Sequence, residues 1–178
     1  MSAPTPEQLE TAIHIWAQVA SGIPATSIIW RNQNGPRPAR PFMTLAIGES
    51  QDLGTGWSNR TDTVSPTPGN ELTYRARGQE RVRVSFEVIT DTTTGSQSAP
   101  AILRRIRGRA RLPSLQELFT AVPMGVASFG PITQLEFLEN KTQQLSRAQM
   151  DCFIYVPTEF TETGTFIETE DHTVILTP

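Results

Sequence analysis

The sequence predicts an α+β protein built on a mostly antiparallel or mixed β-sheet, flanked by an N-terminal helix and a short central helix. Apolar residues recur at intervals of three and four near the N-terminus, which is typical of a helix with one buried face. Around Val82–Val88 and Ala148–Val156 apolar and polar residues alternate, as in half-buried strands of an antiparallel sheet. At 178 residues the chain fits a single domain, residues 1–178.

The first element predicted is a helix that begins after Thr5. Thr5, with Pro6 next and Gln8 three residues on, forms a capping-box pattern with proline at the first helical position. Gly22 and Pro24 end the helix. Its predicted apolar face consists of Leu9, Ala12, Ile13, Trp16, Val19 and Ala20. His14 lies off this face, so we expect it at the surface or in an interface.

Two short strands, residues 27–31 and 42–48, are predicted next. The link between them, residues 32–41, contains three prolines and a glycine, which favour an extended, rigid loop. Residues 49–70 are rich in Gly, Ser, Thr, Asn and Pro, which predicts a long polar loop. Loops of this length are often functional, so we expect the segment to order on docking to a partner.

A long strand or a hairpin is predicted over residues 71–90. Its second half alternates, with Val82, Val84, Phe86 and Val88 on one face and arginines and polar residues on the other. Gly78, in the middle, indicates a turn or a bulge. Strands are predicted again over residues 126–129, 132–140 and 148–156. Cys152, inside the last of these, is expected to be a small core residue rather than a nucleophile.

The predicted central helix is unusually basic. Ser98 is its expected N-cap, residues 99–107 form it and Gly108 ends it, followed by a second helical stretch over residues 115–120. Five arginines lie here, while no acidic residue occurs between Asp91 and Glu117: Arg104, Arg105, Arg107, Arg109 and Arg111. They are consistent with DNA phosphate contacts, with a solvated helix face or with a subunit interface, and the interface is favoured.

The C-terminal residues 158–178 are predicted to form an acidic tail. They contain no Arg or Lys but five acidic residues, namely Glu159, Glu162, Glu168, Glu170 and Asp171. A basic helix and an acidic end on one molecule can pair within a subunit or head to tail between neighbours. We therefore expect the arginines and these glutamates to form a subunit interface, and the tail to order on docking.

Motifs of catalysis and metal binding are missing from the sequence. The single lysine, Lys141, does not follow a glycine-rich turn, and the two histidines, His14 and His172, lack ligand-type neighbours at metal-binding spacing. We expect no enzyme, no cofactor and no metal. The formal charge of −3 argues against nucleic acid or a membrane as the main partner. No secretion signal is recognisable, so the product is expected to be cytosolic when made.

One segment carries a family resemblance. Residues 28–45 read IIWRNQNGPRPARPFMTL, an apolar strand, a Trp-Arg-Asn-Gln stretch, a Pro-Arg-Pro block and a second strand. The block resembles the opening signature of phage neck or tail terminator proteins, which act in tail completion and head-tail joining. Its signature residues are Trp30, Asn32, Gln33, Pro36, Arg37 and Pro38. The order of the other predicted elements also resembles this family, over about residues 5–170.

The resemblance implies a ring, commonly a hexamer, that caps the phage tail tube, stops its polymerisation and offers a docking surface to the head-neck complex. Its partners would be further copies of itself, the tail tube protein, possibly a sheath protein, and head-completion or neck proteins. DNA would pass through the ring lumen without specific binding. Such a protein would reside at the head-tail junction of the virion, after assembly in the host cytoplasm. A head-completion adaptor, a tail-tube subunit and a DNA-binding protein remain alternatives.

Overall fold

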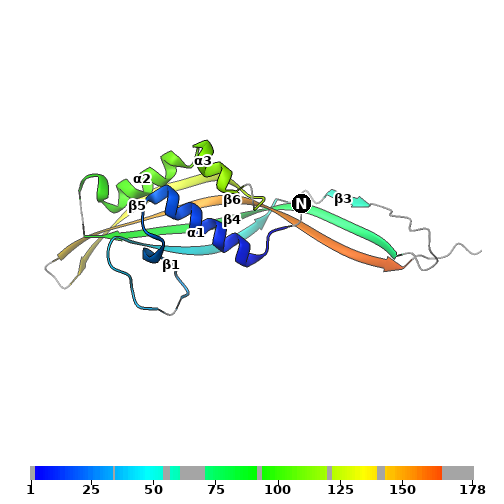
Figure 1. The fold of residues 1–178 in the computed structure, drawn as a ribbon, viewed down its shortest axis with the longest axis horizontal. Helices are drawn as coiled ribbons and strands as arrows, with labels where there is room; N and C mark the ends of the chain where they lie inside the picture. The colour runs from blue at the N-terminus through cyan, green and yellow to red at the C-terminus, as the bar shows by residue number, and fades with distance from the viewer. Residues whose placement is uncertain are drawn as a thin grey trace, which may run out of the picture.

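The computed structural model of the chain describes residues 3–33, 35–53, 57–60, 71–91, 94–119, 122–139 and 143–165. One layer is a six-stranded sheet with the strand order β1-β2-β4-β6-β5, and β3 pairs with β4 beside this path. β1 is parallel to β2 and the other pairs are antiparallel. The second layer consists of helices that cover one face of the sheet (Figure 1). The predicted α+β class is thus confirmed.

Helix α1 (Pro6–Ser21) begins and ends as predicted. Thr5 Oγ1 accepts a hydrogen bond from Gln8 N and Thr5 N donates to Gln8 Oε1, while Gly22 ends the helix with a φ of 76°. The left-handed conformation is one that glycine adopts without strain. The apolar face differs in one position from the prediction. Val19 is 41% exposed, and Ala17 is buried in its place.

His14 is partly buried rather than solvated. Its Nε2 lies 3.1 Å from the carbonyl oxygen of Ile28, so the ring ties α1 to the first residue of β1 (Ile28–Trp30). The residues that precede this strand, Ala25–Ser27, form a 3-10 turn, η1. The side chain therefore has a structural role in holding the helix against the edge strand.

The alternating patterns of the two longest strands bury one face, as predicted. In β4 (Glu71–Thr90) and β6 (Gln143–Thr165) the alternate apolar side chains are at most 6% exposed. These buried residues are Val82, Val84, Phe86, Val88, Ala148, Met150, Cys152, Ile154 and Val156. They pack under the helices together with Met43 and Leu45 of β2 (Phe42–Asp52).

The opposite face of the sheet is polar and is organised by side-chain pairs. Ser85 Oγ donates to Asp151 Oδ1 at 2.6 Å, across a cross-strand pair of β4 and β6. The guanidinium of Arg81 lies 4.1 Å from the ring centroid of Phe153 and donates to Ser128 Oγ at 3.3 Å. Arginine stacked on an aromatic ring keeps its charge accessible while covering apolar surface.

β4 is one continuous strand, so the predicted turn or bulge at Gly78 was wrong. Gly78 pairs directly with Thr158 in an unbroken ladder that runs to Glu71 and Thr165. A Cβ at position 78 would lie 2.8 Å from Thr158 Oγ1, which explains a glycine inside a strand. Glycine is needed at position 78 because the neighbouring strand approaches closely, and not because the chain turns there.

The first residues of β4 and the last residues of β6 pair with each other and form an arm that extends beyond the helices (Figure 1). β3 (Trp57–Arg60) adds to it through residues 74–77 of β4. Two predicted boundaries were wrong in this region. The acidic tail was expected to begin at residue 158, but strand β6 continues to Thr165. The long loop was expected to begin at residue 49, but strand β2 runs to Asp52. Residues 54–56, 61–70 and 166–178 lie outside the described residues.

Substitution of Gly78 tests the close approach on the arm. In the wild-type background Gly78→Ala is expected to lower the free energy of unfolding by about 1 kcal/mol, because overpacking against Thr158 outweighs the gain in strand propensity. In a Thr158→Ala background, which removes Oγ1, the same substitution is expected to stabilise by about 0.5 kcal/mol. Urea unfolding of the four proteins measures both values. Equal effects in the two backgrounds would contradict the steric explanation.

The central helix α2 (Ala99–Arg109) extends past the predicted end at residue 107. Gly108 lies within the helix, and Ala110 follows as its C-cap. Ser98 occupies the N-cap position, but its hydroxyl donates to the carbonyl of Gly95 in the 3-10 turn η2 (Gly95–Gln97). Ala99 N instead donates to Ser146 Oγ of β6 at 3.1 Å. The helix start is therefore fixed by the sheet. α3 (Pro113–Gln116) and the 3-10 turn η3 (Glu117–Phe119) follow.

The predicted strands over 126–129 and 132–140 belong to one strand, β5 (Gly125–Glu139). Its register with β6 shifts between Val126 and Ser128 and again between Phe129 and Ile132. Gly130 and Pro131 lie at the second shift, which accounts for the break in the apolar pattern.

Candidate functional site

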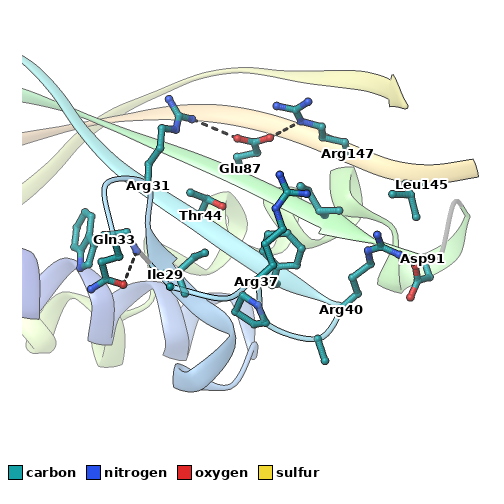
Figure 2. Close-up of a pocket in the computed structure, with 16 residues that line it drawn as sticks. Ile29, Arg31, Gln33, Arg37, Arg40, Thr44, Glu87, Asp91, Leu145 and Arg147 are labelled. Atoms are coloured by element: carbon teal, nitrogen blue, oxygen red, sulfur yellow. Dashed lines mark hydrogen bonds and ion pairs between the residues drawn. The ribbon is translucent and has the colours of Figure 1, made fainter. Parts of the chain in front are cut away.

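An arginine-lined pocket of 610 Å³ lies beneath the loop that joins β1 to β2 (Figure 2). Four arginines from the loop and from β6 surround it, together with two carboxylates: Arg31, Arg37, Arg40, Arg147, Glu87 and Asp91. The prolines of the loop hold it in an extended path across the polar face of the sheet. The pocket thus has an excess of two positive charges. We call it the arginine pocket.

The floor of the arginine pocket is an ion-pair network around a buried carboxylate. The Glu87 side chain is 9% exposed, and its two oxygens accept from different arginines. Arg31 Nη2 lies 3.4 Å from Oε2, and Arg147 Nε pairs with Oε1. At the rim, Arg40 Nη1 lies 2.8 Å from Asp91 Oδ1, with that carboxylate half exposed. One carboxylate shared by two guanidinium groups fixes the loop to β4 and β6 and leaves positive charge in excess.

The signature residues of the loop serve its conformation in different ways. Trp30 packs against the core. Its backbone N–H donates to Gln33 Oε1 at 3.3 Å, and Gln33 N donates to the Trp30 carbonyl at 3.0 Å. Asn32, Pro36 and Arg37 are exposed, and Pro38 is half-buried. Glu87 and Arg147, which complete the network, lie 50 to 110 residues further on, so the sequence analysis did not connect them with the loop.

Two of the five arginines of the basic helix act inside the chain. Arg105 donates to the carbonyl oxygens of Ser21 and Ser96, at 3.1 and 2.9 Å. Arg109 donates to those of Val19 and Ala20, at 2.9 and 3.3 Å. The last turn of α1 contains no basic residue of its own, so these guanidinium groups satisfy its terminal carbonyls and complement the helix dipole.

The other three arginines, Arg104, Arg107 and Arg111, are exposed and form no ion pair with a described residue. They line a groove of 960 Å³ between α2 and the start of β5. Apolar side chains also line it, notably Phe119, Met124, Val126 and Phe129. None of the described residues that line it is acidic. We call this the α2–β5 groove; its positive charge has no counterpart among the described residues around it.

The predicted acidic partners lie on or beyond the arm. Glu159 Oε1 lies 3.4 Å from Arg77 Nη2 of β4, so it is paired within its own arm. Glu162 belongs to β6, opposite Tyr74. Glu168 and Glu170 lie outside the described residues. Within the described residues the structure therefore does not bring any of these glutamates to α2.

Cys152 is buried in the core, as predicted. Burial raises the pKa of its thiol to about 12, and the carboxylate of Asp151 adds to the effect. The native thiol is therefore expected to resist a thiol-specific reagent at pH 8 and to react fully in urea. Because an unfolded thiol ionises near pH 8.5, stability should fall as the pH rises from about 9 toward 12. Rapid labelling of the native protein at pH 8 would contradict the burial.

The described part of the chain contains neither a metal-binding cluster nor a helix suited to crossing a membrane. No group of three or more His, Cys, Asp or Glu residues is placed there to hold a metal ion. Among the helices described, none is long and apolar enough to cross a membrane.

Comparisons with known proteins agree with the predicted resemblance. A family model described as phage neck terminator protein matches residues 7–177. No curated protein sequence is matched. A solved structure titled as the virion of a native gene transfer agent particle contains a similar chain, at 11% identity and a TM-score of 0.33, covering 85% of this chain and 95% of that one. A score this low supports no conclusion about the fold.

Proposed function

The chain belongs to the phage neck terminator protein family, a family of structural virion proteins, and from this we propose that it forms a ring that caps the tail tube. In this role it ends tube polymerisation and provides the surface on which the head-neck proteins dock, at the head-tail junction. Its partners are the tube protein, neck proteins and further copies of itself, which make a ring of six in keeping with related rings. It needs no cofactor and catalyses no reaction.

The observation that carries the ring is the unmatched charge of the α2–β5 groove. A closed ring requires two different patches on each subunit that meet around the circle. The groove offers one patch, with three arginines and no acidic residue among the described residues that line it. The acidic end of the chain offers the other, and it follows the arm, which extends away from the helices (Figure 1). Fork-shaped guanidinium groups suit such register-fixing pairs with carboxylates.

Reversal of the groove charge tests this interface. Arg104→Glu together with Arg107→Glu is expected to abolish the ring, because acids on both patches repel each other. Arg37→Glu is the matched control, since it reverses an exposed arginine that lines the arginine pocket instead. It is expected to leave the ring intact. Sedimentation velocity measures both, and a ring that survives the double reversal would refute the interface.

Termination itself is tested with purified tube protein. With this protein present, tubes should stop growing and carry one ring at an end in electron micrographs. A tail-tube subunit would instead form long polymers alone, and a head-completion adaptor would leave tube growth unchanged. Tubes that lengthen as freely with the protein as without it would contradict the proposed function.

A further inference from the structure

We propose that the acidic C-terminal segment of one copy, residues 166–178, binds in the α2–β5 groove of the next copy. Neighbouring subunits would then exchange their ends around the ring. The inference rests on the ring proposed above and names the occupant of its groove. Three independent features of the chain support it.

The first feature is the chemistry of the groove. Arg104, Arg107 and Arg111 supply three guanidinium groups that form no ion pair with a described residue. Opposite them, the start of β5 and the residue before it supply apolar lining side chains, Val126 and Met124. A ligand that suits this surface has several carboxylates with apolar side chains close by. Carboxylates paired bidentately with arginine bind more strongly than neutral hydrogen-bonding groups.

The second feature is the sequence of the segment, FIETEDHTVILTP. Its three acidic residues, Glu168, Glu170 and Asp171, match the three arginines in number. Apolar residues stand on both sides, Phe166 and Ile167 before them and the Val-Ile-Leu run 174–176 after them. No Arg or Lys interrupts the segment. Both the charge and the apolar character of the groove therefore find a counterpart.

The third feature is the reach of the segment, which disfavours pairing within one chain. The end of the groove nearest the arm is at Gly125, which pairs with Tyr155 of β6. From Tyr155 to Thr165 the strand advances about 33 Å along the arm, at about 3.3 Å per residue. Asp171 is six residues past Thr165 and can return by at most about 21 Å. The acidic Cα atoms therefore stop about 12 Å short of their own groove, which favours the groove of another copy as their binding site.

The arginine pocket is the weaker alternative for this segment. Three of its arginines already have acidic partners within the chain. Glu87 pairs with Arg31 and Arg147, and Asp91 pairs with Arg40. Duplex DNA is a poorer match for the groove, because apolar side chains such as Met124 and Val126 line it and the chain as a whole carries a formal charge of −3. Both remain as outcomes that the experiment distinguishes.

Mixing two full-length variants tests exchange between copies. One variant carries Glu168→Arg, Glu170→Arg and Asp171→Arg; the other carries Arg104→Glu, Arg107→Glu and Arg111→Glu. Alone, each places like charges together and is expected to lose the ring. In a 1:1 mixture each end meets an opposite charge on its neighbour, so rings of wild-type mass are expected to return. Light scattering after mixing, with both proteins unmixed as controls, gives the result.

Other outcomes separate this inference from the proposed function. Wild-type rings with no recovery in the mixture would overturn the exchange and leave the ring standing. If the wild type forms no ring, a fluorescent peptide of residues 166–178 titrated with full-length protein decides: binding weakened at least about tenfold by the three groove reversals supports the site. Unchanged binding in that variant, or loss of binding only with Arg37→Glu, overturns it. The site is also overturned if duplex DNA displaces the labelled peptide at a lower concentration than the unlabelled peptide does.

Discussion

Trp16→Ala is expected to lower the free energy of unfolding by about 3–5 kcal/mol, the range typical of large aromatic truncations in a core. The Trp16 side chain is fully buried on α1 and joins the helical layer to the sheet. Its ring meets Phe86 of β4 edge-on at 5.8 Å and stacks on Phe119 and Phe129 at 5.8 and 6.4 Å. Truncation thus opens a cavity where α1, η3, β4 and β5 converge.

Two controls isolate the cause of that loss. Trp16→Phe keeps an aromatic ring and removes a buried indole N–H that has no hydrogen-bond partner among the described residues, so it should cost less than about 2 kcal/mol. Ile15→Ala changes a side chain on the same helix that is 44% exposed, and it should cost less than about 1 kcal/mol. Urea unfolding of the variants gives these values. A Trp16→Ala cost no larger than that of Ile15→Ala would contradict the packing.

Arg147→Ala is expected to lower the free energy of unfolding by about 2–3 kcal/mol, because it leaves the buried Glu87 carboxylate with one partner instead of two. The expected loss of stability is smaller than for a fully buried ion pair, because the Arg147 side chain is 37% exposed. The loop over the arginine pocket should also become easier to cleave with protease. Thermal or urea unfolding and limited proteolysis measure the two effects.

A double variant separates lost charge pairing from lost packing. In the Arg147→Ala background, Glu87→Gln removes the buried charge and should recover at least about 1 kcal/mol. Arg77→Ala, which breaks a more exposed pair with Glu159 on the arm, should cost less than about 1 kcal/mol. No recovery in the double variant would show that the network does not hold the loop.

Local patterns predicted the elements whose cause is local. The capping box at Thr5, the αL glycine at position 22 and the alternation of Val82–Val88 each depend on neighbours within a few residues, and all three were confirmed. Gly78 was misjudged because its reason is Thr158 on another strand, eighty positions away. The length of the arm was missed for a similar cause. Its polar residues resemble a loop, and only the pairing of β4 with β6 makes them strands.

The basic helix was identified from composition, but the division of its arginines was not. Arg105 and Arg109 were grouped with the outward arginines, although they bind the terminal carbonyls of α1. That role depends on how α2 packs against α1, which a single sequence does not encode in any local pattern. Arg104, Arg107 and Arg111 line the groove as an interface would require, and their pairing with a neighbour stays a prediction.

The solution mass of the purified protein, followed by light scattering over a series of salt concentrations, tests the ring most directly. At low salt we expect one discrete mass that is a small multiple of 19.7 kDa, about six in keeping with related rings. Rising salt should return it toward the monomer, since screening weakens exposed charge pairs. A mass of 19.7 kDa at every protein and salt concentration, or a mass that grows without limit, would contradict a closed ring held by the α2–β5 groove.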